Sequence, residues 1–218
     1  MKEIGCIFLS WRKGVGYERH IVGVIKKSVS KGYFFSYIKD GIEKAKVEGF
    51  APYTEFPEEG KTYKENVLET FSQRLTKSDR PDIQDFYSFW EIKPQYKDDK
   101  YYLLAHTMGL LPTDNFELLA DYRPKKDLSF MTDLAGMSKL KLPSGSVKAG
   151  DILSFEPEPT NRHDKHAVKV FKDGIPLGYI KKIHSKVFHG KRSKGIKLVV
   201  KAVDQNGVIK RIFVKVSF

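Results

Sequence analysis

The sequence predicts an α+β protein made of two small domains, and three observations lead to this prediction. The chain has 218 residues, a length that suits one large domain or two small ones. Its first part contains β-prone runs followed by helical patterns, and its last part consists mainly of short strands. The charge is also segregated: residues 1–124 hold 19 basic and 19 acidic side chains, so residues 125–218 carry the whole net charge of +12.

We place the domain boundary within residues 121–127 (DYRPKKD), where a proline and a lysine pair coincide with the change in charge. The first expected domain, residues 1–124, is a small β-sheet with helices. The second, residues 125–218, is a small β-barrel or sandwich with short helices.

Strands come first in the expected N-terminal domain, and helices follow. Runs rich in β-branched and aromatic residues predict strands at Cys6–Trp11, His20–Lys26 and Gly32–Ile38. Short helices are predicted at Ile42–Glu48, Glu65–Leu75, Asp82–Trp90 and Lys100–Thr107. The large aromatic residues of these helices, Phe71, Phe86 and Trp90, are expected to lie in the core.

The second domain is expected to consist of strands joined by tight turns. Strands are predicted within Leu128–Lys141 and at Asp151–Glu156, Ala167–Lys172, Ile175–Ile180, Ile196–Asp204 and Val208–Val216, with a helix at Ile183–His189. Asp173-Gly174 and Asn206-Gly207 are strong hairpin signals, because both residues of such a turn readily adopt positive φ.

The composition is typical of a soluble, intracellular protein. No apolar run approaches the roughly 18–20 residues of a membrane span, and the N-terminus lacks the pattern of a signal peptide. Cys6 is the only cysteine, so neither an internal disulfide nor a zinc ribbon can form. We therefore expect a cytoplasmic protein without a membrane partner.

The segregated positive charge favours a polyanionic partner, and nucleic acid is the commonest large polyanion in a cell. A solubilising surface is the alternative, although solubility rarely requires such segregation. DNA is expected more than RNA, but the charge alone does not separate the two.

One stretch of about thirty residues carries a specific pattern. Residues 150–182 contain Gly150-Asp151 before a strand, Glu158-Pro159 with Asn161 and Asp164, Ala167-Val168, and Gly178-Tyr179-Ile180 after the hairpin. This pattern resembles the HIRAN domain, a module fused to some DNA-remodelling helicases and also found in bacteria. The resemblance implies a small β-barrel of the SH3-like or OB-like kind that binds single-stranded DNA and, in some members, grips a free 3′ end.

The resemblance also implies site residues. Asn161 and Asp164 would lie in the loop that faces the terminal nucleotide, where a carboxylate could accept a hydrogen bond from a 3′-hydroxyl. His163 stands where end-binding members carry an aromatic residue. Tyr179 would contact a base or sugar, and Lys181 and Lys182 would neutralise phosphates.

This chain departs from the end-binding members in the segment that supplies their base-stacking tyrosines. The counterpart here, residues 136–140 (GMSKL), offers Ser138 and Lys139 and no aromatic residue. Since base stacking contributes roughly 1–3 kcal/mol per base, this change weakens the expected pocket. Further phosphate contacts are expected from Lys191 and Arg192.

Structural alternatives stand beside these roles. Asn161 and Asp164 could build an Asx turn between strands, and this could coexist with ligand binding. Tyr179 could be a packing residue, and the lysine run from Lys181 to Lys197 could be a solvated face.

Enzymatic chemistry is not indicated. The histidine pairs His163/His166 and His184/His189 lack a nearby cysteine or carboxylate set for a metal, and no nucleophile elbow, P-loop or dinucleotide fingerprint is present. We expect no cofactor, no metal and no catalytic residue, and we consider a nuclease or hydrolase unsupported.

Residues 1–120 resemble the N-terminal subdomain of HipA-type kinases, the toxin kinases of bacterial persistence modules. The match rests on GFAPYTEFP at residues 49–57, FSQRL at 71–75 and Leu111-Pro112-Thr113-Asp114 with Phe116. The kinase core is absent from the matched region, so the resemblance implies a bacterial docking or regulatory module.

Two hypotheses follow. The first is a non-enzymatic DNA-binding adaptor, whose C-terminal domain binds single-stranded DNA or 3′ ends and whose N-terminal domain docks a protein. The second is an antitoxin-like regulator of a HipA-type kinase, in which DNA binding is secondary.

Overall fold

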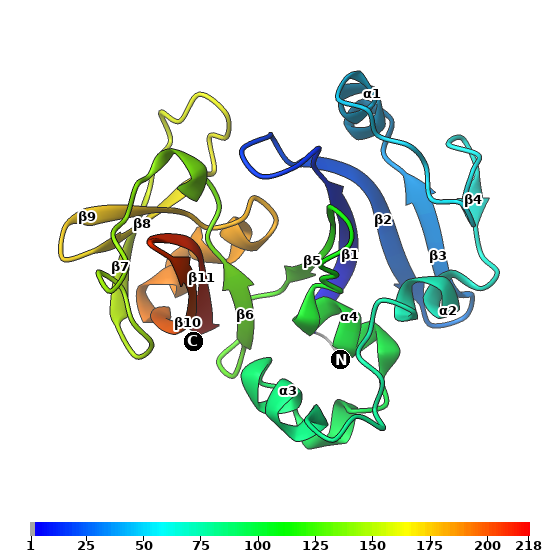
Figure 1. The fold of residues 1–218 in the computed structure, drawn as a ribbon. Coiled ribbons are helices and arrows are strands. Elements are labelled where there is room, and N and C mark those ends of the chain that lie inside the picture. The colour runs from blue at the N-terminus through cyan, green and yellow to red at the C-terminus, as the bar shows by residue number, and fades with distance from the viewer. Residues whose placement is uncertain (1–2) are drawn as a thin grey trace. The chain divides into compact units, whose positions relative to one another are not determined.

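The computed structural model describes residues 3–218, except for the side chains of Lys139, Lys191 and Arg192. The chain divides into two compact units, Met1–Asp121 and Tyr122–Phe218, each with its own sheet (Figure 1). No helix in the described part of the chain is long and apolar enough to cross a bilayer.

Unit 1 contains a five-stranded sheet in the order β4-β3-β2-β1-β5. Its strands are β1 (Ile4–Trp11), β2 (His20–Ser28), β3 (Gly32–Tyr37), β4 (Thr62–Tyr63) and β5 (Phe116–Tyr122). Strands β1 to β4 pair with their neighbours in antiparallel fashion. The three strands that the sequence predicts are confirmed, whereas β4 and β5 are additions.

Four short helices accompany this sheet: α1 (Lys39–Val47), α2 (Val67–Ser72), α3 (Ile83–Phe89) and α4 (Lys100–Thr107), with a 3₁₀ turn, η1 (Pro94–Tyr96), before α4. All four stand where the sequence predicts helices, and α2 is shorter than expected. Phe71 is fully buried and Trp90 nearly so, whereas Phe86 is only half-buried. The expected core role therefore holds for Phe71 and Trp90.

Aromatic rings fill the centre of unit 1. Phe35, Phe56 and Phe71 pack with ring centroids 5.1–5.5 Å apart, and Tyr53 bridges from Phe71 to Phe116 at 5.2 and 5.1 Å. Such offset and edge contacts add to the hydrophobic effect of burying the rings.

A buried arginine ties four segments of unit 1 together. All five N–H donors of Arg74 are used: they reach Gly109 O, Tyr53 Oη, Phe116 O and both carboxylate oxygens of Asp114, at 2.7–3.2 Å. Arg74 is 5% exposed, and full satisfaction of its donors offsets the desolvation of its charge.

Unit 2 contains a six-stranded antiparallel sheet in the order β6-β11-β10-β7-β8-β9. Its strands are β6 (Ser129–Asp133), β7 (Ile152–Pro157), β8 (Val168–Lys172), β9 (Ile175–Tyr179), β10 (Lys197–Asn206) and β11 (Val208–Ser217). The six predicted strands and both hairpins are confirmed. Asp173 and Gly174 have φ of +49° and +79°, as a tight primed turn requires.

A 3₁₀ helix, η3 (His184–Phe188), stands in place of the helix that the sequence predicts at Ile183–His189. Two further 3₁₀ turns lie elsewhere in the unit, η2 (Met137–Lys139) and η4 (Lys191–Gly195). Unit 2 therefore has less helix than expected, although its mixed, barrel-like character agrees with the prediction.

The sheet of unit 2 curls until its two outer edges meet (Figure 1). Ala135, which follows β6, and Tyr179, at the end of β9, exchange two backbone hydrogen bonds of 2.7 and 2.9 Å. We call this bridge the seam. A Cβ on Gly178 would lie 2.5 Å from Ala135 O, so the close approach at the seam requires glycine.

Candidate nucleic-acid interface

The loop between β7 and β8 is built by its own polar side chains. Asn161 Oδ1 accepts hydrogen bonds from the backbone N–H groups of His163 and Asp164, at 2.9 and 3.1 Å. Asp164 Oδ1 accepts one from His166 N at 2.9 Å. Asn161 and Asp164 therefore form consecutive Asx turns, the structural alternative that the sequence left open.

A carboxylate joins this loop to the seam. Glu158 Oε2 accepts hydrogen bonds from Asn161 Nδ2 at 2.6 Å and from Tyr179 Oη at 3.0 Å, and Glu158 Oε1 lies 3.4 Å from Lys169 Nζ. The hydrogen bonds from Asn161 and Tyr179 hold the pKa of Glu158 below its usual range, because they stabilise the ionised form. We call Glu158, Asn161, Lys169 and Tyr179 the polar cluster.

Tyr179 occupies the centre of this region. Its backbone forms the seam, its ring lies over Gly136, and its side chain is half-buried. Burial, and then the hydrogen bond to Glu158, raise the pKa of Tyr179, so its hydroxyl remains protonated and donates to Glu158. Lys169 lies across from Tyr179 on β8, with its ammonium 6.0 Å from the ring centroid.

The structure separates the two lysines that follow β9. Lys182 is exposed, whereas Lys181 is only 2% exposed and forms an ion pair with the buried Asp133. Arg211 Nε contacts the other oxygen of this carboxylate at 3.3 Å. The predicted phosphate contact by Lys181 is therefore wrong for this conformation, because its ammonium points into the fold.

The remaining predicted site residues lie in short turns. Ser138 is exposed in η2, a 3₁₀ turn, and His163 is exposed in the loop between β7 and β8. Lys139, Lys191 and Arg192 belong to η2 and η4, and their side chains lie outside the described residues.

The histidines of unit 2 make local contacts. The rings of His166 and His189 meet edge to face with centroids 5.4 Å apart, and His189 Nε2 lies 3.0 Å from His166 O. His184 Nδ1 lies 2.8 Å from Thr132 Oγ1 in the core. Among the described residues, no three His, Cys, Asp or Glu side chains are placed to hold a metal.

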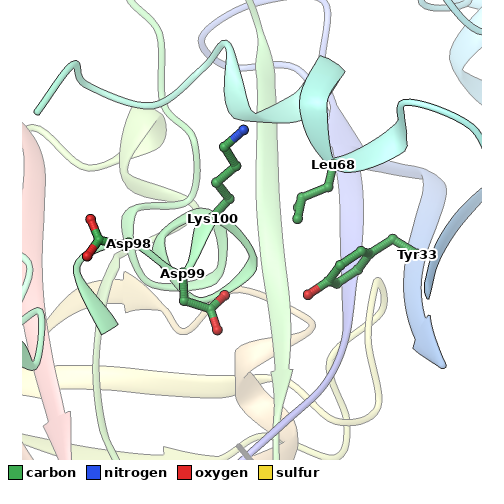
Figure 2. A pocket seen from close by; sticks show the side chains of 5 residues that line it. All are labelled: Tyr33, Leu68, Asp98, Asp99 and Lys100. Atoms are coloured by element: carbon green, nitrogen blue, oxygen red, sulfur yellow. The ribbon is translucent and has the colours of Figure 1, made fainter. Parts of the chain in front are cut away.

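An open hollow in unit 1 offers no comparable chemistry. It has a volume of about 390 Å³ and is lined by Tyr33, Leu68, Asp98, Asp99 and Lys100 (Figure 2). Asp99 already caps α4, because its Oδ1 accepts from Tyr102 N at 2.9 Å. Figure 2 shows Asp98 turned away from the Tyr33 ring, so the side chains do not converge on one point.

Sequence reasoning missed two members of the polar cluster as site residues, Glu158 and Lys169. Glu158 stands in the matched motif only as a pattern position, and Lys169 as the polar residue of an alternating strand. Charges of opposite sign that flank a turn-forming loop were the signal that could have linked them.

Comparisons with known proteins assign the second unit. A family model described as the HIRAN domain matches residues 128–216. A solved structure, "Crystal structure of HIRAN domain of human HLTF", is similar with 21% sequence identity and a TM-score of 0.32, over 40% of this chain and 74% of that chain. No curated protein matches the chain.

The matched residues all lie in unit 2, and the comparisons give no support to the resemblance between residues 1–124 and HipA-type kinases. By its match to this family model, the stretch from residue 128 to residue 216 is a HIRAN domain.

Proposed function

We propose that this protein binds single-stranded DNA, including its 3′ ends, through the HIRAN domain, and that it does so without catalysis. The observation that carries the proposal is the polar cluster: it holds the Asn161–Asp164 loop against Tyr179 beside the seam. This arrangement offers a ring, hydrogen-bonding groups and a lysine at one place, as recognition of a nucleotide requires.

The charge of the C-terminal region supports the same proposal. Residues 125–218 carry the whole net charge of +12. Among their exposed lysines, Lys165 lies in the loop, Lys182 shortly before η3 and Lys186 within η3. Neutralising phosphates releases counterions, so affinity should fall steeply with salt.

Fluorescence anisotropy across a salt series tests the proposal. We expect the protein to bind a single-stranded oligonucleotide with a 3′-hydroxyl more tightly than the same strand with a 3′-phosphate, a duplex, or a heparin-like polyanion. Equal affinity for DNA and the heparin-like polyanion at moderate salt would reduce the interaction to charge alone and would contradict the proposal.

The two neighbouring lysines give a matched test of the charge contribution. Lys182→Ala should weaken DNA binding and reduce the slope of log K against log salt by about 1, with little change in thermal stability. Lys181→Ala should instead lower stability, because it removes the buried one of the two cations that are paired with Asp133. Circular dichroism melting and a salt series on both variants distinguish them, and equal effects on the salt slope would contradict the assignment.

We also propose that unit 1 docks a protein. Residues 1–124 carry no net charge, and Val15, Tyr17, Val29 and Val47 expose more than half of their surface in this unit. Affinity capture with residues 1–124 deleted, compared with the full chain, tests this role: a partner retained by the truncated chain would contradict it.

A further inference from the structure

The polar cluster has a fixed hydrogen-bond polarity, and Glu158 is responsible for it. A glutamate that is ionised only accepts hydrogen bonds. Its Oε2 receives both the Tyr179 hydroxyl proton and one N–H of the Asn161 amide, at 3.0 and 2.6 Å. Because both donors bond to the same oxygen, the hydroxyl of Tyr179 and the amide of Asn161 must lie close together.

The orientation of the Asn161 amide is determined from both ends. Its oxygen accepts from the two backbone N–H groups of His163 and Asp164, so this side of the amide is already used. Its nitrogen gives one proton to Glu158. The second N–H of the amide, also a donor, is directed at the phenol oxygen of Tyr179, so a ligand group at this point would meet that N–H and the phenol oxygen together.

Tyr179, in contrast to Asn161, presents a hydrogen-bond acceptor. A phenol has one proton and two lone pairs, and the proton of Tyr179 is given to Glu158. The phenol oxygen can therefore offer a ligand only lone pairs, so it acts as an acceptor. Without the carboxylate, the hydroxyl could rotate and donate instead, and the Asn161 amide nitrogen would lose its carboxylate partner.

We propose that Glu158 is a positioning residue of the nucleic-acid interface, which presents Tyr179 as an acceptor and Asn161 as a donor to the same ligand group. A sugar hydroxyl satisfies both, because it donates and accepts, whereas a phosphodiester oxygen only accepts. This inference rests on the proposed function and adds to it the residue that sets the polarity of the site.

Electrostatics provides a test, because the two possible roles of Glu158 predict opposite changes in DNA affinity when its charge is removed. If Glu158 were merely a negative charge near a polyanion, removing its charge would strengthen DNA binding. Glu156 is the matched control: it lies two residues earlier on β7, is exposed, and pairs in register with the same Lys169. Glu156→Gln removes the same charge but leaves the cluster intact.

The experiment compares the full chain with its Glu158→Gln and Glu156→Gln variants, using a single-stranded DNA with a 3′-hydroxyl. We expect Glu156→Gln to bind as tightly as the unmodified protein or up to about twofold more tightly. Glu158→Gln should bind about tenfold more weakly, and its preference for the 3′-hydroxyl over the 3′-phosphate should shrink. An RNA with a blocked 3′ end shows whether the hydroxyl that contacts Tyr179 and Asn161 is the terminal 3′-hydroxyl or a ribose 2′-hydroxyl.

A second variant protects the test against a folding defect. Tyr179→Phe keeps the ring but removes the hydroxyl, and we expect a similar loss. In a protein that already carries Tyr179→Phe, Glu158→Gln should reduce DNA affinity by less than it does alone, since the two residues act together. Additive losses would overturn the proposal, as would a Glu158→Gln variant that binds like Glu156→Gln. Failure of the unmodified protein to bind any oligonucleotide would instead reject the proposed function itself.

Discussion

Replacing Arg74 by alanine should destabilise unit 1 by about 3–5 kcal/mol, because it leaves buried groups without their charged partner. Asp114, Tyr53 and the carbonyl groups of Gly109 and Phe116 all lose a hydrogen bond from one side chain. Arg74→Lys should be nearly as damaging, since an ammonium cannot reproduce the five donors of a planar guanidinium. Chemical denaturation followed by tryptophan fluorescence measures this change selectively, because Trp11 and Trp90, the two tryptophans of the chain, both belong to unit 1.

The chain contains a control with the same chemistry at the surface. Arg80 and Asp82 form a similar two-bonded pair, with Nε to Oδ1 at 2.8 Å and Nη2 to Oδ2 at 2.6 Å, but both side chains are 55% exposed. Exposed pairs are screened by solvent and contribute little to stability, so Arg80→Ala should barely shift the same transition. Similar shifts for Arg74→Ala and Arg80→Ala would show that burial does not determine the value of the pair.

The strands of unit 2 could be predicted because each has a local signal. Val168 and Val170 are buried and alternate with the half-buried Lys169 and Phe171 along β8, and Asp173-Gly174 and Asn206-Gly207 define the hairpins. Strand β5 was missed for the opposite reason. Its sequence, FELLADY, contains good helix formers and no β-branched residue, so pairing in the sheet overrides a weak local preference.

The residues of the candidate site could be predicted only in part from the sequence, for a related reason. The motif located the Asn161–Asp164 loop and Tyr179, since local turn chemistry and a glycine next to a tyrosine are visible in sequence. The burial of Lys181 depends on Asp133, which lies 48 positions away, and no local pattern encodes such a pair. The link from Glu158 to Tyr179 spans 21 positions and likewise becomes visible only when the sheet curls.

Replacing Gly178 by alanine should open the seam and destabilise unit 2 by about 2–6 kcal/mol. The new Cβ would stand 2.5 Å from Ala135 O, a backbone atom that cannot move without breaking the bridge to Tyr179. Overpacking costs about 1–3 kcal/mol, and the φ of +135° at this position adds strain of about 1–3 kcal/mol for a residue with a side chain. Amide hydrogen exchange of β6 and β9 measures the loss.

Gly174→Ala is a control that separates the two causes of the Gly178→Ala effect, the close contact with Ala135 O and the backbone strain. Gly174 also has a positive φ, +79°, but a Cβ there would meet no atom within 4 Å, so only the conformational cost of roughly 1–2 kcal/mol applies. Because Gly178→Ala also displaces Tyr179 from Glu158, it should lower the affinity for single-stranded DNA by more than about tenfold, while Gly174→Ala should leave it unchanged. If both variants show the same amide hydrogen exchange and the same affinity for single-stranded DNA, the contact at the seam does not position Tyr179. The interface must then be held by the Asn161–Asp164 loop alone.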